Sequence, residues 1–563
     1  MQALENKAIA SRFKLLGQLM ELHDENPFKV KAISNASFKL DKLPFKIVDR
    51  SEEELSQQPG IGKSTAAKVW ELLQTGKIGE LETFLSKTPE GILEMLTIKG
   101  IGPKKIYIIW HTLGIETLGE LYYACNENRL VEAKGFGLKT QEEIRKAIEF
   151  TMANEGLFLY AQVEKVYIPL LADLKNHLPS SEKLQSTGDF RRNMEILSAL
   201  DLITTASKEE VLSFVEQSPS FTLFAHKEGL LECVNENGLP VNIHLASEAN
   251  YAQQLFITTG SELHVQQLRQ HLRGIIPALP SEEAIYSQAG MDYIVPELRE
   301  GLNELALAEE HRLPLLITEN DLKGTLHNHS TWSDGMHSLQ EMALYCKNQL
   351  ALQYLGICDH SQSAVYANGL SPERVKAQWA EIDRLNAQLA PFRIFKGIES
   401  DILSDGSLDY EEDILRGFDF VVASIHSNLR MDEDRATQRL IKAIENPYTT
   451  ILGHPTGRLL LARKGYPIDY KKVIDACAAN KVVIEINANP LRLDLDWRWH
   501  RYALEKDVIL SINPDAHRTE GFHDMHFGIL VARKGGLGKE QCLNCLDSTS
   551  IEDFFTKRRV CNS

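Results

Sequence analysis

Hydrophobic residues along the chain change their spacing twice, and each change marks a different kind of structure. In the first 150 residues they recur every three or four positions, as in residues 6–21, which predicts helices. Between about 155 and 315, short alternating runs such as FTLFAH and PVNIHLA stand between helical stretches, which predicts an α+β region. From about 320 onward, apolar strand-like runs end repeatedly in His, Asp or Glu. This last pattern predicts an α/β barrel-like domain with its chemistry at the carboxyl ends of the strands.

Three similar segments recur in the helical first part: PGIGKSTAAKVWELL, KGIGPKKIYIIW and KGFGLKTQEEIRKAI. Their glycines let the backbone approach a phosphate, and the helix that follows presents free N–H donors. Lysines after each turn would neutralise phosphates. Any single turn of this kind is as consistent with a plain helix connection, so the prediction rests on the repetition. We predict three helix–hairpin–helix motifs that bind DNA through Gly60, Gly62, Lys63, Gly100, Gly102, Lys104, Lys105, Gly135, Gly137 and Lys139.

The net charge of −17 does not argue against a DNA partner, because all of it falls after residue 150. The first 150 residues carry equal numbers of acidic and basic side chains. Eight cysteines in 563 residues do not make a disulfide framework. No apolar run approaches the roughly 18 residues that span a bilayer, and the N-terminus lacks the apolar core of a secretory signal. We therefore expect a cytoplasmic protein without a membrane partner.

The segment HNHSTWSDG at residues 327–335 is the strongest chemical signal in the sequence. Two histidines alternate in it and so project from one face of a strand. Further His, Asp and Glu residues each follow an apolar run, and such sets suit Zn²⁺, Mn²⁺ or Fe ions that carry out hydrolysis. One such histidine alone would by default be structural, but their number at strand ends predicts a metal site. Its candidate ligands are His327, His329, Asp334, His360, Glu399, His426, His454, Asp515 and His517.

The hairpin series and the segment GDFRRNMEILSALDLI at residues 188–203 resemble family X DNA polymerases, and residues 320–540 resemble the PHP (polymerase and histidinol phosphatase) phosphoesterase domain of bacterial members. The resemblance implies a multidomain fold: an all-α helix–hairpin–helix region, an α+β nucleotidyltransferase-like palm and a C-terminal α/β domain with a distorted β/α barrel. The expected domains are a lyase-like domain at 1–82, a fingers-like domain at 83–153, the palm at 154–247, a thumb-like region at 248–315 and the PHP domain at 320–563.

The PHP resemblance also implies two or three divalent ions. His327, His329, Glu399 and Asp515 would hold one ion, and Glu399 would bridge to a second ion that His426 also binds. Asp334, His360 and His517 would hold a third, and His454 would complete the cluster. Arg458 and Arg518 stand next to these ligands and are candidates for binding the substrate phosphate, with a structural salt bridge as the equal alternative.

The palm motif is incomplete. Gly188, Arg191 and Arg192 match the family, but the three aspartate positions read Ala199, Asp201 and Asn242. Because Asp201 alone cannot organise two Mg²⁺ ions, we expect weak or absent polymerisation and no secure Mg²⁺ site here. Lys68 matches the lysine that forms a Schiff base with an abasic sugar in the family, but we favour an ordinary exposed helix lysine.

Together these features predict a DNA-repair enzyme that acts as a metal-dependent 3′→5′ exonuclease or 3′-end phosphodiesterase on gapped or 3′-end DNA, as a monomer. A gap-filling polymerase and a non-catalytic DNA-binding scaffold are the alternatives. A small-molecule phosphatase is disfavoured, because a small substrate has no use for the hairpins. The aromatic segment LDLDWRWH at residues 493–500 could stack a base at the mouth of the PHP domain, and packing of Trp497 and Trp499 on helices is at least as consistent with it.

Overall fold

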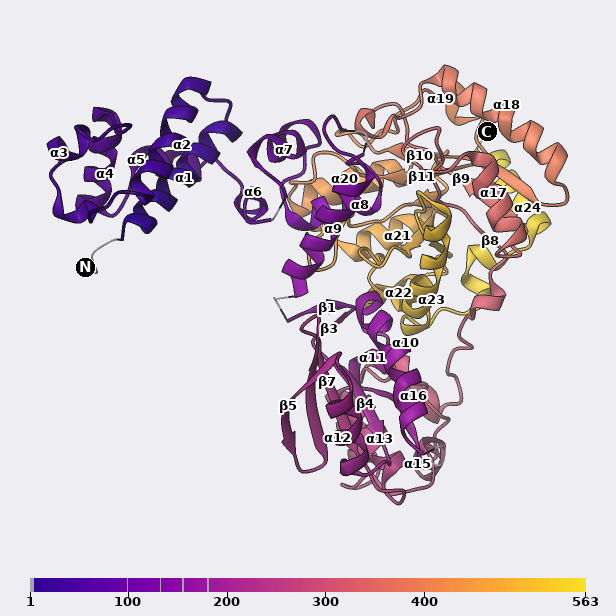
Figure 1. Cartoon of the computed structure of the whole chain (residues 1–563). Helices are drawn as coiled ribbons and strands as arrows, with labels where there is room; N and C mark the ends of the chain where they lie inside the picture. The colour runs from indigo at the N-terminus through magenta and orange to yellow at the C-terminus, as the bar shows by residue number, and fades with distance from the viewer. Residues whose placement is uncertain (1–4, 99, 132, 154–155, 180–181, 563) are drawn as a thin grey trace. The chain divides into compact units, whose positions relative to one another are not determined.

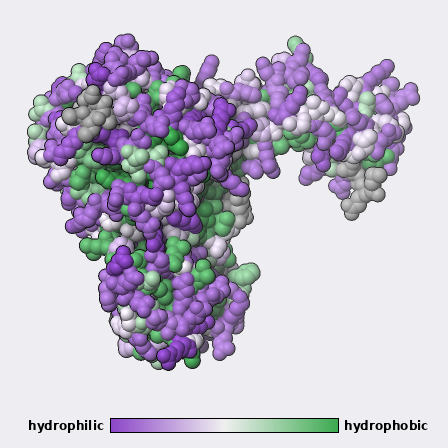
Figure 2. All heavy atoms as spheres, turned by 180° about the vertical axis from the view of Figure 1, so that it is seen from behind, coloured by the Kyte–Doolittle hydropathy of each residue, from purple (hydrophilic) through white to green (hydrophobic). Residues whose placement is uncertain are grey.

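The computed structural model describes residues 5–98, 100–131, 133–153, 156–179 and 182–562 (Figure 1). The chain divides into two compact units, Met1–Glu149 and Phe150–Ser563. The boundary expected between residues 153 and 154 adjoins residues 154–155, which lie outside the described residues. Within the described ranges, no helix combines the length and the apolar character needed to cross a bilayer. Figure 2 shows a surface on which hydrophilic residues predominate.

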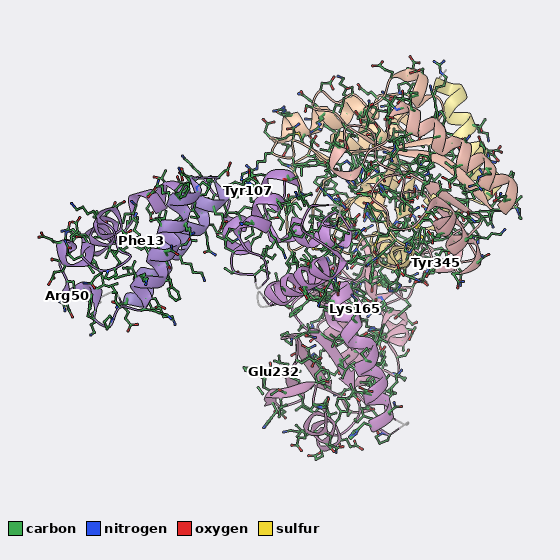
Figure 3. All side chains as sticks on the ribbon, turned by 45° about the horizontal axis from the view of Figure 1, so that its top comes forward. Phe13, Arg50, Tyr107, Lys165, Glu232 and Tyr345 are labelled. Carbon is green, nitrogen blue, oxygen red and sulfur yellow. The ribbon has the colours of Figure 1, made fainter. Side chains whose placement is uncertain are left out.

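The first unit is helical. Its core includes Phe13, which is fully buried and lies among the helices of the unit in Figure 3. The three Gly-apolar-Gly turns share one geometry, because Gly60, Gly100 and Gly135 have φ of 87°, 95° and 93°, a region that favours glycine. The α-helices are α1(Asn6–Leu22), α2(Pro27–Asp41), α3(Glu52–Ser56), α4(Lys63–Thr75), α5(Gly79–Leu85), α6(Glu90–Met95), α7(Pro103–Tyr107), α8(Leu118–Asn126) and α9(Leu138–Ala153).

The second unit begins with a middle region built on a five-stranded sheet of order β2-β4-β7-β6-β5. Helices α10(Tyr160–His177) and α12(Lys208–Gln217) pack on it through one shared hydrophobic core. The strands are β2(Leu184–Thr187), β4(Leu200–Thr204), β5(Phe221–Lys227), β6(Leu230–Asn235) and β7(Pro240–Leu245), and a small pair is formed by β1(Phe158–Leu159) and β3(Ile196–Leu197). The remaining helices are α11(Gly188–Arg191), α13(Tyr251–Thr259), α14(Glu262–His271), α15(Glu282–Gln288) and α16(Glu304–Glu309).

The rest of the second unit is a barrel region of seven parallel strands, in the order β14-β13-β12-β11-β10-β9-β8, with helices around it (Figure 1). The two edges meet just beyond the strands, where Asn328 bridges Ala516 and the His329 amide donates to the Ala516 carbonyl at 2.9 Å. The helical first unit, the mixed middle region and this nearly closed barrel confirm the predicted fold class. The strands are β8(Gly324–Thr325), β9(Tyr354–Ile357), β10(Arg393–Asp401), β11(Phe420–Ser424), β12(Ile451–Leu452), β13(Val483–Asn487) and β14(Leu510–Asn513).

The helices of the barrel region are α17(Leu339–Asn348), α18(Pro372–Leu389), α19(Glu412–Leu415), α20(Glu433–Ile444), α21(Tyr470–Asn480), α22(Trp497–Glu505), α23(Met525–Lys534) and α24(Ser548–Asn562). Ile551 and Phe555 of α24 join the core cluster of the strands. Trp497 is buried and its indole N–H donates to Glu195 of the middle region at 3.0 Å. Trp499 stacks on Tyr470 at 4.7 Å. Both tryptophans therefore pack against the protein itself. This agrees with the interpretation of the segment as helix packing.

A buried lysine on α23 also joins the two regions of the second unit. The Lys534 ammonium lies 2.5 Å from Glu300 and donates to the Arg192 carbonyl at 2.9 Å. It also lies 4.5 Å from the centre of the Trp497 ring, within cation–π range. Because a buried charge is stabilised only when it is paired and hydrogen-bonded, these contacts fix the middle region against the barrel.

The contacts of His526 on α23 make the stability of this junction depend on pH. Its ring nitrogens lie 2.9 Å from Glu164 on α10 and 2.7 Å from Glu319, and the hydrogen bond to Glu164 is the main cause that raises the pKa of His526 to about 9. The stabilisation is therefore complete below the unfolded pKa of about 6.5 and is lost as the pH rises through about 9. Since the side chain is 38% exposed, we expect a loss of only a few tenths of a kcal/mol between pH 7 and pH 9.

Urea unfolding at pH 6, 7, 8 and 9 measures this contribution. His526→Gln should remove that part of the pH dependence, whereas His311→Gln, at an exposed pair with Asp292, should leave it in place. An unchanged slope in His526→Gln would contradict the assignment.

Candidate metal centre

Each of the seven barrel strands delivers polar side chains to one end of the barrel. His327, His329 and Asp334 follow β8, His360 follows β9, Glu399 lies in β10, His426 follows β11, His454 follows β12, Glu485 lies in β13, and Asp515 and His517 follow β14. Parallel strands end on the same side of a barrel, so residues far apart in sequence converge there. All nine sequence-predicted ligands are brought together, and seven of them are buried to 5% exposure or less at the side chain.

Glu399 is at the centre of this cluster. One carboxylate oxygen, Oε1, lies 2.9 Å from His454 Nε2, 3.1 Å from His426 Nε2 and 3.2 Å from His327 Nε2. The other, Oε2, lies 3.0 Å from His360 Nδ1. A single carboxylate thus faces imidazoles from four other strand ends.

Two further groupings lie beside Glu399. His329 Nε2 is 3.0 Å from Asp515 Oδ1, and His327 Nε2 is 3.6 Å from the same oxygen. Asp334 lies 3.4 Å from His517 Nε2 and 3.6 Å from His360 Nε2. Among the sequence-predicted ligands, all of which the structure describes, three sets have ligand atoms within 4.8 Å of one another: His327, His329 and Asp515; His360, Glu399 and His426; and His329, Asp334, His360 and His517.

Buried acids that the sequence analysis did not single out position these side chains. Glu485 Oε1 lies 2.8 Å from His327 Nδ1, and its other oxygen accepts the His454 amide at 2.8 Å. Asp401 contacts His426 Nδ1. Because the rings of His327 and His426 are held through Nδ1, the Nε2 atom of each ring is directed at Glu399. A lone acid within the apolar run VVIEIN and an acid two residues after Glu399 were the available signals.

The carboxylates and imidazoles of the cluster shift one another's pKa values. Burial acts to raise the pKa of Glu399, but His426 and His327 outweigh it and hold that pKa well below the usual range. Burial, together with His517 and His360, lowers the pKa of His329 to about 3. The ionised Glu399 and the neutral His329 are in the protonation states that bind a cation. The acids around His327 and His426 raise the pKa of both imidazoles, so a cation that binds there must displace their protons.

The hydrogen bonding of the candidate ligands is a second observation that fits a divalent cation. Several buried ligand atoms have no hydrogen-bond partner among the residues that the structure describes, and a buried polar atom without a partner costs about 1–3 kcal/mol. Divalent cations at the cluster would give several of them a partner. These atoms are His327 Nε2, His329 Nδ1 and Nε2, Asp334 Oδ2, His360 Nδ1, Glu399 Oε2 and His454 Nδ1.

The two arginines proposed to bind phosphate differ in their surroundings. Arg458 Nε donates to the Arg492 carbonyl at 2.8 Å, and its two terminal nitrogens contact Asp496, at 2.7 Å, and the Leu493 carbonyl. These contacts agree with the alternative for Arg458, a structural salt bridge. Arg518 is exposed directly after His517, and a role for it in binding phosphate stays a prediction.

In the first unit, Gly62 and Gly102 are the N-cap residues of α4 and α7, and a Cβ at either would meet nothing within 4 Å. Lys63, Lys104 and Lys139 are exposed. The turns therefore present open backbone and lysine side chains to solvent, as phosphate binding requires.

Lys68, the candidate Schiff-base lysine, lies 3.1 Å from Ser64 Oγ and 3.4 Å from Glu80 Oε2. Lys29 lies 2.5 Å from the other oxygen of Glu80. Lys68 and Lys29 thus share the carboxylate of Glu80. The lyase role of Lys68 stays a prediction.

The residues of the predicted palm motif come together in the middle region. Asp201 on β4 pairs in register with Asn242 on β7, whose amide donates to Asp201 Oδ1 at 3.0 Å. Ala199 directly precedes β4. Gly188 has φ of 65°, and a Cβ on it would lie 2.7 Å from Asp201 Oδ2, so only glycine fits there. Asn242 thus presents an amide donor to Asp201 at a position where the family resemblance implies a carboxylate.

Both arginines of this motif are already paired. Arg191 binds Glu282 at 2.7 Å, and Arg192 binds Glu300 at 2.9 Å and also contacts Asp189. The two glutamates come from later segments and were not foreseen from the sequence. Because these carboxylates neutralise the guanidinium groups, the charge that would attract a triphosphate is satisfied within the protein.

Comparison with known proteins agrees with these features. A model described as a helix–hairpin–helix domain matches residues 4–78, and one described as a SAM-like helix–hairpin–helix tandem matches residues 92–149. A probable phosphatase of Thermoanaerobacter sp. (strain X514) is 30% identical over 176 residues, which are 30% of this chain and 69% of that protein. The DNA polymerase/3'-5' exonuclease PolX of Bacillus subtilis (strain 168) is 34% identical over 580 residues, which cover 98% of this chain and 100% of that protein. With its hairpins, its mixed α/β middle region and its metal-binding barrel, this chain belongs to the PolX family.

Proposed function

We propose that this protein is a DNA-repair enzyme that removes nucleotides from DNA 3′ ends by metal-dependent hydrolysis in the barrel region. The observation that carries the proposal is the buried cluster around Glu399, where candidate ligand atoms converge from the ends of several strands. Several of these atoms, among them His329 Nε2 and Asp334 Oδ2, have no hydrogen-bond partner in the described part of the chain. The helix–hairpin–helix motifs supply the affinity for DNA, which a small-molecule phosphatase would not need. The name of the Bacillus subtilis relative includes a 3′-5′ exonuclease.

In the proposed reaction, water cleaves the last phosphodiester bond and gives a nucleoside 5′-monophosphate and a new 3′-hydroxyl. Divalent cations bound at the cluster supply Lewis acidity at the phosphoryl group. The protein's part is to fix the ligands: Glu485 and Asp401 hold His327 and His426 through their Nδ1 atoms. Arg518 is the candidate for contacting the phosphate from the rim. We further propose that the chain acts as a monomer in the cytoplasm.

The test is a gel assay with purified protein, Mn²⁺ and a 5′-labelled primer in a one-nucleotide gap. Shortening of the primer that is abolished by His327→Ala and His329→Ala supports the proposal. Full activity in those variants would refute it, and stoichiometric metal binding without turnover would favour the DNA-binding scaffold.

The same assay with dNTPs tests the middle region. We expect no templated extension, because Asp201 faces Asn242 rather than a second carboxylate, and Arg191 and Arg192 are paired with glutamates. Extension by one templated nucleotide would mean that another carboxylate completes the site and would favour a gap-filling polymerase. A parallel reaction with the His327→Ala variant keeps degradation from masking weak extension.

A further inference from the structure

A loop between β9 and α18 carries exposed apolar side chains beside the metal centre. Val365 lies in the short 3-10 helix Val365–Ala367 and is 82% exposed. The ring of the next residue, Tyr366, lies 6.2 Å from the ring of His360, a member of the cluster, at an interplanar angle of 60°. The loop therefore places an aromatic ring next to the cluster and an aliphatic side chain beyond it.

This loop is fixed in place by its backbone. The Leu370 amide donates to the His360 carbonyl at 2.9 Å and so closes the loop at its base. Gly369 is packed so tightly that a Cβ there would overlap the carbonyl oxygen of Ser361. Arg374 of α18 donates to the carbonyls of Asn368, at 2.7 Å, and Gly369, at 3.2 Å. The exposure of Val365 is therefore imposed by a fixed loop.

A second exposed apolar residue is held through its backbone by another candidate ligand. Met336 is 38% exposed, and its backbone amide donates to the His517 carbonyl at 2.7 Å. The rings of His517 and His360 lie 6.2 Å apart, and both belong to the set that includes Asp334. The backbone of Met336 and the ring of Tyr366 thus adjoin two histidines of this set, His517 and His360.

We propose that Met336, Val365 and Tyr366 form a base-binding lip that holds the 3′-terminal nucleobase while its 5′-phosphate lies on the cluster. A nucleobase has two flat apolar faces that stack on aromatic rings, and such stacking tolerates every base. A free phosphate or a short phosphomonoester has nothing to place on these side chains. The lip therefore selects a nucleotide over other phosphate esters without selecting its sequence. The proposal rests on the proposed exonuclease function and names the part of the substrate that the site recognises.

The experiment compares two single-stranded, 5′-labelled oligonucleotides that differ only in the last residue. One ends in thymidine and the other in a tetrahydrofuran abasic analogue, so the bond to be cleaved is the same. The rate of the first cleavage is measured with Mn²⁺ for the full chain and for the variants Tyr366→Ala, Tyr366→Phe and Val365→Ser. Tyr502→Ala, at a surface tyrosine of α22 that binds Asp475, is the matched control.

We expect the wild type to favour the thymidine end by about tenfold in kcat/KM, the scale of base–aromatic stacking. Tyr366→Ala should raise KM for the thymidine end by about tenfold and leave the abasic end unchanged, whereas Tyr366→Phe and Tyr502→Ala should keep the preference. Val365→Ser should raise KM for the thymidine end by a smaller factor than Tyr366→Ala does. The side chain of Val365 is in solvent, so this variant does not depend on how Tyr366→Ala folds.

Two results would refute the proposed base-binding lip. One is an equal rate of cleavage of both ends by the wild type, and the other is an equal loss of kcat/KM on both substrates in Tyr366→Ala. Both results would leave the exonuclease proposal standing, because cleavage would still occur. Failure of the wild type to cleave either oligonucleotide would refute the proposed function itself, so the two failures are distinguishable.

Discussion

Replacing Glu399 with glutamine is expected to lower the rate of phosphodiester hydrolysis by about a thousandfold, the upper range for loss of one preorganised electrostatic contact. The carboxylate faces His454, His426 and His327 through one oxygen. An amide keeps the size of the side chain but removes the negative charge, and its NH₂ group cannot bind a cation. We therefore expect the metal content of the purified protein to fall together with the rate.

The measurement combines a primer-degradation assay with elemental analysis of the same preparation. Glu412→Gln, at an exposed residue paired with Arg416, is the control and should match the wild type in both. A Glu399→Gln protein that keeps its metal and its rate would exclude Glu399 from the centre of the site. The DNA affinity of the variant, measured without added metal, should stay unchanged, because the predicted DNA-binding hairpins lie in the first unit.

Replacing Glu485 with glutamine is the second large effect that we expect. Its carboxylate receives four contacts: His327 Nδ1 at 2.8 Å and the Asn513 amide at 3.1 Å on one oxygen, and the His454 amide at 2.8 Å and the Asn487 amide at 3.3 Å on the other. Glutamine would present its own NH₂ donors to one of these pairs. We expect the positions of His327 or His454 to loosen and the metal affinity to fall by about 10–100-fold.

Competition for Mn²⁺ or Zn²⁺ with a chelating dye measures that affinity without requiring activity. Hydrolysis in excess metal should recover more fully in Glu485→Gln than in Glu399→Gln, since the first variant keeps every predicted ligand. Glu505→Gln, at an exposed pair with Arg501, supplies the matched control. Wild-type affinity in Glu485→Gln would show that His327 is held by the barrel backbone alone.

The sequence by itself determined the kinds of structure and which candidate ligands lie together at one end of the barrel. Spacing of apolar residues predicted helices, then a mixed region, then parallel strands, because local periodicity decides which face an element can bury. The candidate ligands could be predicted because each follows an apolar strand, and parallel strands of a barrel end on one side. The loss of palm carboxylates at Ala199 and Asn242 was also visible, since a missing acid needs no structure to be recognised.

Only the tertiary structure decided which partner each polar group has. In the sequence, Glu485 is a single acid within an apolar strand. Only the folded barrel shows that it contacts His327. Glu282 and Glu300 are ordinary helix and loop acids in the sequence, but the fold brings them onto Arg191 and Arg192. The physical reason is that local pattern specifies which face an element buries, whereas a pairing between residues separated by about 100 positions depends on how the elements pack.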